Sequence, residues 1–134
     1  MRRRPVRGFT LIELLIVIVI LGLLLSLVAP TMFSKVGSSQ RKTAMAQMQM
    51  LSTALDTYRL DTGVFPSQLS DLLAASVPGW DGPYLPRDVP SDPWGNPYVY
   101  SLETDDPAKP YSLKSFGKDG REGGDADNED IIFQ

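Results

Sequence analysis

The stretch Arg7-Gly8-Phe9-Thr10-Leu11-Ile12-Glu13 opens an apolar run that extends to Ala29. As a helix, residues 9–29 would span about 30 Å, which matches the hydrocarbon core of a bilayer. Glu13 is the only charged residue in this run. A carboxylate inside lipid costs ~2.5–3.5 kcal/mol on insertion scales, so such groups usually serve a function. We therefore predict a transmembrane helix over 9–29 in which Glu13 has a functional partner.

Two ordinary targeting signals are alternatives for this segment. A cleaved secretory signal has a shorter apolar stretch, followed by a small-x-small cleavage site. Here the run is longer, and the small residue, Gly8, precedes it. An uncleaved signal anchor is the other alternative. Arginines before the run (Arg2, Arg3, Arg4, Arg7) and none just after it favour a cytoplasmic N-terminus and an exported C-terminus.

The junction resembles the prepilin-peptidase signal of type IV pilins and of the pseudopilins of type II secretion. The resemblance implies that residues 1–8 form a cleaved leader and that a membrane peptidase cuts between Gly8 and Phe9. The same enzyme would N-methylate Phe9. In a filament, Glu13 would pair with the positive Phe9 amine of the neighbouring subunit.

Composition narrows the possible classes of function. The chain has 134 residues, which leaves room for one small domain after the leader and membrane segment. Histidine is absent, which excludes a Ser-His-Asp triad, and without cysteine no disulfide can form. The formal charge is −3, and no basic patch of the kind that binds nucleic acid is present.

Residues 30–62 are predicted to continue the helix as an amphipathic segment. Pro30 and Gly37-Ser38-Ser39 disfavour regular helix, so we expect a kink or a local melt after the membrane run, and not a clean stop. Gly63 is a plausible C-cap, and Pro66 prevents continuation. Apolar residues at three- and four-residue spacing predict one buried stripe: Ala44, Met48, Leu51, Leu55 and Tyr58.

Residues 63–134 are predicted to form a globular domain of the α+β class. A short second helix over 67–77, capped by Ser67, would precede an ordered loop over 78–97 that is rich in proline, glycine and aromatic residues. The remaining elements would be strands, at 98–102, 111–115 and 131–133.

An acidic loop precedes the last predicted strand. Residues 119–130 contain six acidic side chains and three glycines, a composition that suits the oxygen ligands of calcium. The spacing superficially suggests an EF-hand, but Arg121 and Gly123 occupy ligand positions, so we reject that motif. Because six carboxylates repel one another, the choice is between a calcium site and a disordered, solvated loop.

Beyond the signal, the chain resembles the major pseudopilins of type II secretion. The resemblance is carried by residues 55–66, 92–98 and 115–120, and by Gly123-Gly124 and Asp130-Ile131. It implies a type IV pilin-like fold, in which a long N-terminal helix packs on a small antiparallel sheet and the last loop binds calcium. The implied ligands are the side chains of Asp119, Asp130 and Asp127 and the carbonyls of Phe116 and Gly124. Which of Asp125, Asp127 or Glu129 completes the set stays open.

The function implied is that of a structural subunit, not an enzyme. The subunit would polymerise at the inner membrane into a pseudopilus that drives export of folded proteins across the outer membrane. Its partners would be other copies of itself, minor pseudopilins, the prepilin peptidase, an inner-membrane platform protein and the secretion ATPase. Residues 63–134 would lie in the periplasm. The alternative is a type IV pilus subunit, whose Gram-negative members generally carry a C-terminal disulfide loop.

Overall fold

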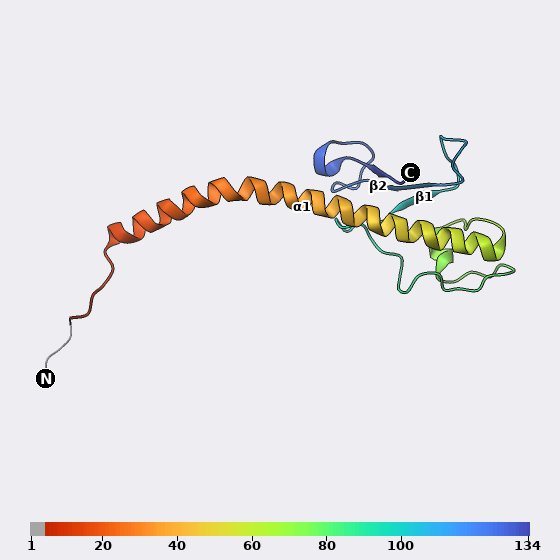
Figure 1. Cartoon of the computed structure of the whole chain (residues 1–134), viewed down its shortest axis with the longest axis horizontal. Coiled ribbons are helices and arrows are strands. Elements are labelled where there is room, and N and C mark those ends of the chain that lie inside the picture. The colour runs from red at the N-terminus through yellow and green to blue at the C-terminus, as the bar shows by residue number, and fades with distance from the viewer. Residues whose placement is uncertain (1–4) are drawn as a thin grey trace. The chain divides into compact units, whose positions relative to one another are not determined.

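The computed structural model describes residues 5–134 (Figure 1). Arg2, Arg3 and Arg4 of the predicted leader lie outside the described residues. The chain divides into two compact units, one ending at Val36 and one covering Gly37–Gln134. The elements in chain order are α1 (Leu11–Thr62), the 3₁₀ turn η1 (Leu69–Leu72), β1 (Val99–Ser101), β2 (Ser112–Ser115), the 3₁₀ turn η2 (Ala126–Asn128) and β3 (Ile131–Ile132).

Helix α1 is unbroken through both positions at which the sequence disfavours helix. It has 52 residues and includes Pro30 and Gly37. The helix does not stop at Pro30, as predicted, and of the two expected disruptions the local melt is absent. Proline costs a helix ~3 kcal/mol, and the apolar run before it and the packed stripe after it provide enough regular helix to offset that cost. The helix ends as expected, because Gly63 has a φ of +84° and its N–H donates to the Arg59 carbonyl at 2.8 Å.

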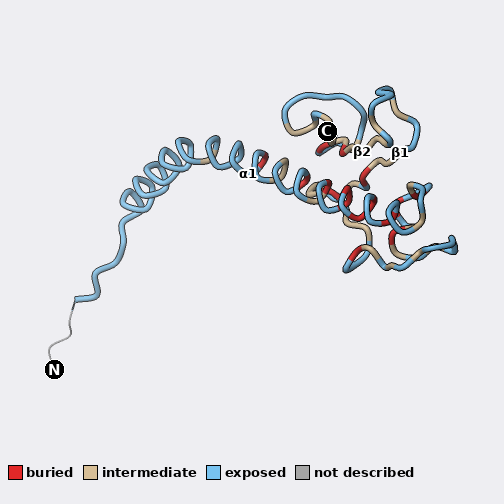
Figure 2. The backbone as a smooth tube through the Cα atoms, turned by 45° about the vertical axis from the view of Figure 1, so that its right-hand side comes forward, coloured by how far each residue is buried: buried red, intermediate tan, exposed pale blue. Residues whose placement is uncertain are grey.

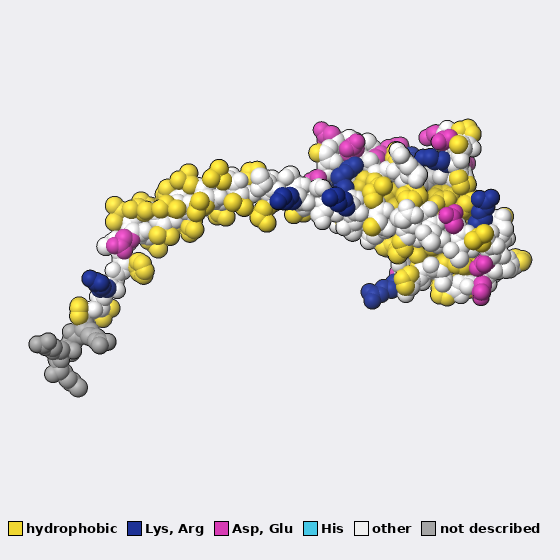
Figure 3. Space-filling view, in the orientation of Figure 1, with side chains coloured by type: hydrophobic (Ala, Val, Ile, Leu, Met, Phe, Trp, Pro, Cys, Tyr) yellow, Lys and Arg dark blue, Asp and Glu magenta, His cyan; other side chains and the backbone are white. Residues whose placement is uncertain are grey.

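The first unit exposes its apolar side chains. Every large hydrophobic residue from Leu11 to Val28 is at least half exposed (Figure 2). Hydrophobic side chains cover this part of α1 (Figure 3). This helix is long and apolar enough to cross a membrane. A continuous apolar surface of this size marks contact with lipid or with other apolar helices.

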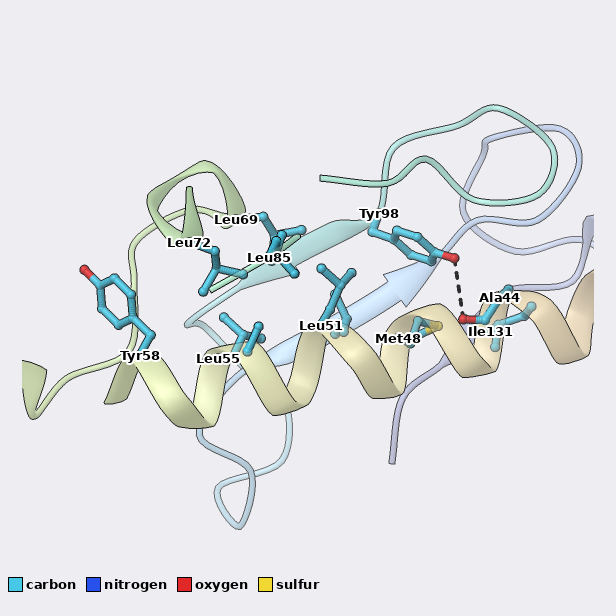
Figure 4. Close-up of a cluster of buried hydrophobic side chains, with 12 residues drawn as sticks. Ala44, Met48, Leu51, Leu55, Tyr58, Leu69, Leu72, Leu85, Tyr98 and Ile131 are labelled. Carbon is cyan, nitrogen blue, oxygen red and sulfur yellow. Dashed lines mark hydrogen bonds between the residues drawn. The ribbon is translucent and has the colours of Figure 1, made fainter. Parts of the chain in front are cut away.

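The core of the second unit lies along one face of α1 and confirms the predicted stripe. All five stripe residues are buried, with Leu51 and Leu55 at 0% exposure. The hydroxyl of Tyr98 lies 3.5 Å from the Ala44 carbonyl (Figure 4), and its nearer acceptor is the side-chain oxygen of Gln47 at 2.5 Å. Burial, and then the charge of Asp92, raise the pKa of Tyr98. Facing the stripe are Leu69, Leu72, Leu85, Tyr98, Leu113 and Ile131.

The sheet is antiparallel in the order β1-β2-β3. Tyr100 of β1 pairs with Leu113 of β2, and Ser115 pairs with Ile131 of β3. Along β2 the side chains alternate, so that Leu113 and Ser115 are buried. The three predicted strands are present, each shorter than predicted.

The predicted helix over 67–77 is wrong, since only the turn η1 forms. The loop that follows uses the carbonyls that a continuing helix would need. The N–H of Tyr84 donates to the Leu72 carbonyl at 2.8 Å, and the Trp80 indole donates to the Asp71 carbonyl at 3.1 Å. Ser67 does not cap the turn, because its hydroxyl donates to the Asp71 carboxylate. Trp80, Tyr84 and Trp94 of the loop over 78–97 pack against the core.

Candidate functional site

The N-terminal junction is open around the predicted cleavage point. Phe9 is almost fully exposed, and nothing lies within 4 Å of the position that a side chain at Gly8 would occupy. A shallow hollow is lined by Arg7, Gly8, Phe9 and Glu13. The geometry therefore leaves the Gly8–Phe9 peptide accessible to an enzyme.

Thr10 caps helix α1, a role that we did not predict. Its hydroxyl accepts the Glu13 N–H at 3.3 Å, and its carbonyl accepts the Leu14 N–H at 3.3 Å. The signal was present in the sequence, because Thr-x-x-Glu before an apolar run is the capping-box pattern. Glu13 consequently lies in the first turn, where the helix dipole favours a negative charge.

The three predicted carboxylate ligands in the acidic loop make separate contacts. The Asp119 carboxylate accepts the Arg121 N–H at 3.1 Å within its own turn. The Asp130 carboxylate accepts the Gly123 N–H at 3.0 Å. The Asp127 side chain instead contacts Gly37 on α1. Within residues 5–134, no three acidic side chains are gathered as a metal-binding group, so the predicted trio is not brought together.

The backbone of the loop closes on itself around its glycines. Gly117 has a φ of +70° and Gly124 a φ of +97°, and a Cβ at either position would come within 3 Å of Asn128. The Lys118 N–H also donates to the Asp127 carbonyl at 2.9 Å. Glycine is required at these two positions by both conformation and space. The beginning of the loop is thereby held against its end.

Arg41 joins the loop to α1. Its guanidinium donates to the Glu129 carbonyl at 3.1 Å and to the Ala126 carbonyl at 3.4 Å, and it lies 3.7 Å from the Glu129 carboxylate. No local sequence signal identifies this contact, because its partners lie more than eighty residues away.

One oxygen of the loop fits a hard cation. Asp130 Oδ1 is buried and has no hydrogen-bond partner. Buried carboxylate oxygens normally accept a hydrogen bond, and coordination to an oxygen-binding cation such as calcium would take the place of that bond. With neither histidine nor cysteine in the chain, softer metals lack their preferred ligands.

Two sequence families match the chain. The family described as type II secretion system protein G matches residues 31–134, and the prokaryotic N-terminal methylation motif matches residues 3–29.

Individual relatives match over nearly the whole length. A type II secretion system core protein G of Pseudomonas aeruginosa is 37% identical, over 98% of this chain and 96% of its own length. The corresponding protein of Xanthomonas campestris is also 37% identical, over 95% and 89%. A crystal structure of the major pseudopilin from the type 2 secretion system of enterohaemorrhagic Escherichia coli superposes with a TM-score of 0.55 at 27% identity, covering 71% of this chain and 86% of that one.

Proposed function

The chain belongs to the type II secretion system protein G family, and from this premise we propose that it polymerises at the inner membrane into a pseudopilus that moves folded proteins across the outer membrane. It is a structural subunit of the secretion system, and the pilus alternative receives no such support. The observation that carries this conclusion is the match over both the N-terminal signal and the folded unit. We propose no catalytic activity for it.

The first step of the proposed function is processing. A prepilin peptidase cleaves between Gly8 and Phe9 and methylates the new amine of Phe9. The exposure of Phe9 and the methylation motif over residues 3–29 support this step. The arginines before the apolar run would keep the N-terminus cytoplasmic, with residues 63–134 in the periplasm.

The second step is assembly through Glu13. The Glu13 carboxylate pairs with the Phe9 amine of the next subunit as the helix leaves lipid for the filament. Opposite charges attract more strongly in a desolvated environment, which offsets the cost of keeping a carboxylate in the membrane. The exposed apolar side chains of residues 11–28 then form the filament interior.

Assembly needs other components of the secretion system. The proposed partners are copies of the same chain, minor pseudopilins, an inner-membrane platform protein and the secretion ATPase. The membership of the chain in a secretion family supports this set, and we propose no nucleic-acid partner.

We also propose that the acidic loop holds calcium. Asp119 and Asp130 would supply carboxylates, and Phe116 and Gly124 would supply carbonyls. A third carboxylate would come from Asp125, Asp127 or Glu129; Asp127 would have to turn away from Gly37 to take part. The unpartnered oxygen of Asp130 supports the site. Calcium would hold the loop in a chain that has no disulfide to do so.

Filaments sheared from cells that carry the secretion machinery test the proposal. Mass spectrometry of the filament subunit should find a chain that begins at Phe9 and carries one extra methyl group. Glu13→Gln keeps the shape and removes the charge, so this variant should be cleaved and inserted but absent from filaments. Filaments that contain Glu13→Gln at the wild-type level would contradict the assembly step.

A further inference from the structure

The turn at residues 92–97 is rich in turn-forming residues, and the side chain at its centre, Asp92, is a buried carboxylate. Asp92 is only 4% exposed. Its Oδ1 accepts the N–H groups of Trp94 at 3.1 Å and Asn96 at 2.8 Å. Its Oδ2 accepts the hydroxyl of Ser115, which is fully buried, at 2.7 Å. A buried carboxylate is costly unless it is satisfied, and here three neutral donors satisfy it.

The contacts of Asp92 continue to the entrance of the acidic loop. The Ser115 hydroxyl oxygen accepts the N–H of Gly117 at 3.3 Å. The Asn96 side-chain amide donates to the carbonyl of Gly117 at 3.0 Å. Both polar groups of Gly117 are therefore bound by residues that Asp92 holds, and the hydrogen bonds form a closed ring through Asp92, Ser115, Gly117 and Asn96.

The ring binds Gly117, which lies just before the acidic residues 119–130. Gly117 is buried, has a φ of +70°, and lies against Asn128 at the other end of the loop. The next residue, Lys118, donates to the Asp127 carbonyl at 2.9 Å. A shift of the Gly117 peptide would therefore displace both ends of the loop.

We propose that Asp92, Asn96 and Ser115 are positioning residues that fix the Gly117 peptide and thereby set the conformation of the acidic loop. The turn at 92–97 is thus a brace for the loop as well as a chain reversal. The effect on calcium affinity rests on the calcium site proposed above, whereas the effect on loop order does not. In the braced loop, the Gly117 N–H and the Phe116 carbonyl of the same peptide are held in place before a cation binds.

Two ring variants and one matched control test the brace in the full chain in detergent micelles. Ser115→Ala removes the acceptor of the Gly117 N–H, and Asn96→Ala removes the donor to its carbonyl. Leu72→Ala opens a cavity in the core at a residue that takes no part in the ring. Amide hydrogen exchange over residues 117–129 is followed in chelator, and calcium binding is titrated separately.

The ring variants should accelerate exchange over 117–129 in chelator by roughly threefold to tenfold, the equivalent of one lost hydrogen bond. They should weaken calcium binding by a similar factor, and Ser115→Thr, which retains a hydroxyl, should restore part of the loss. Exchange over 117–129 that is unchanged in the ring variants, or raised no more than in Leu72→Ala, would overturn the brace. If the wild-type chain binds no calcium but the ring variants still accelerate exchange, the brace stands and the calcium proposal falls.

Discussion

The guanidinium of Arg41 donates to the carbonyl of Glu129 at 3.1 Å across 88 residues of sequence. Arg41 is on α1, whereas Glu129 directly follows η2 at the end of the acidic loop. Their side chains also form an ion pair at 3.7 Å, the only one within residues 5–134. The guanidinium of Arg41 thus connects the acidic loop to helix α1.

Removing the Arg41 side chain should loosen the end of the acidic loop. In Arg41→Ala the carbonyls of Ala126 and Glu129 lose their donor, at a cost of about 0.5–1.5 kcal/mol because the pair is partly exposed. Amide exchange over residues 126–130 should rise, while exchange in the core of α1 stays unchanged. The exposed neighbour Lys42 provides the control, and an equal effect of Lys42→Ala would contradict a specific role for Arg41.

The contact between Gly37 and Asp127 predicts a conditional effect of Gly37→Ala. Alanine favours helix over glycine by about 1 kcal/mol, so this substitution alone would stabilise an isolated helix. Here the new methyl group would collide with the Asp127 carboxylate. Gly37→Ala should therefore gain less than this amount in the wild-type chain, because the Asp127 side chain must first turn away, and should show the full gain when combined with Asp127→Ala. Thermal unfolding of the two single variants and the double variant, followed by the fluorescence of Trp80 and Trp94, measures these effects. Additive effects would show that residues 37 and 127 have no interaction energy.

Truncating two leucines of α1 compares how much its buried face and its exposed face contribute to stability. Leu55 is fully buried in the core, whereas Leu60, five residues later, is 84% exposed. Leu55→Ala should lower the free energy of unfolding by about 2–5 kcal/mol, and Leu60→Ala should change it by less than about 0.5 kcal/mol. Unfolding in denaturant measures the difference. Equal losses would mean that the stripe is not the core.

These residues also show how far sequence reasoning extends. The stripe could be predicted because one helix face repeats every three to four residues. The N-terminal methylation motif could be predicted because its residues lie in one short stretch of the sequence. Arg41, Gly37 and the Asp92 ring could not, because each depends on contacts between segments far apart in the chain. The helix over 67–77 was predicted wrongly for the same reason: Trp80 and Tyr84 bind its carbonyls from the following loop.

Calcium should stabilise the second unit through the acidic loop. At a concentration one hundred times its dissociation constant, a ligand that binds only the folded state adds about 2.7 kcal/mol. The melting temperature of the full chain in detergent should therefore rise with calcium and fall with chelator. Asp130→Asn should abolish most of this response, and Asp88→Asn, an exposed acid outside the loop, should retain it. Identical melting temperatures with calcium and with chelator would contradict the proposed calcium site.

The central claim is that this chain is a subunit of the secretion pseudopilus. The most direct measurement is the amount of secreted enzyme in the culture medium of a strain that lacks the gene, with surface pili and twitching scored in parallel. The account predicts that exoenzymes accumulate inside the cell while pili stay normal, and that the wild-type chain restores secretion. Loss of pili with normal secretion would contradict it.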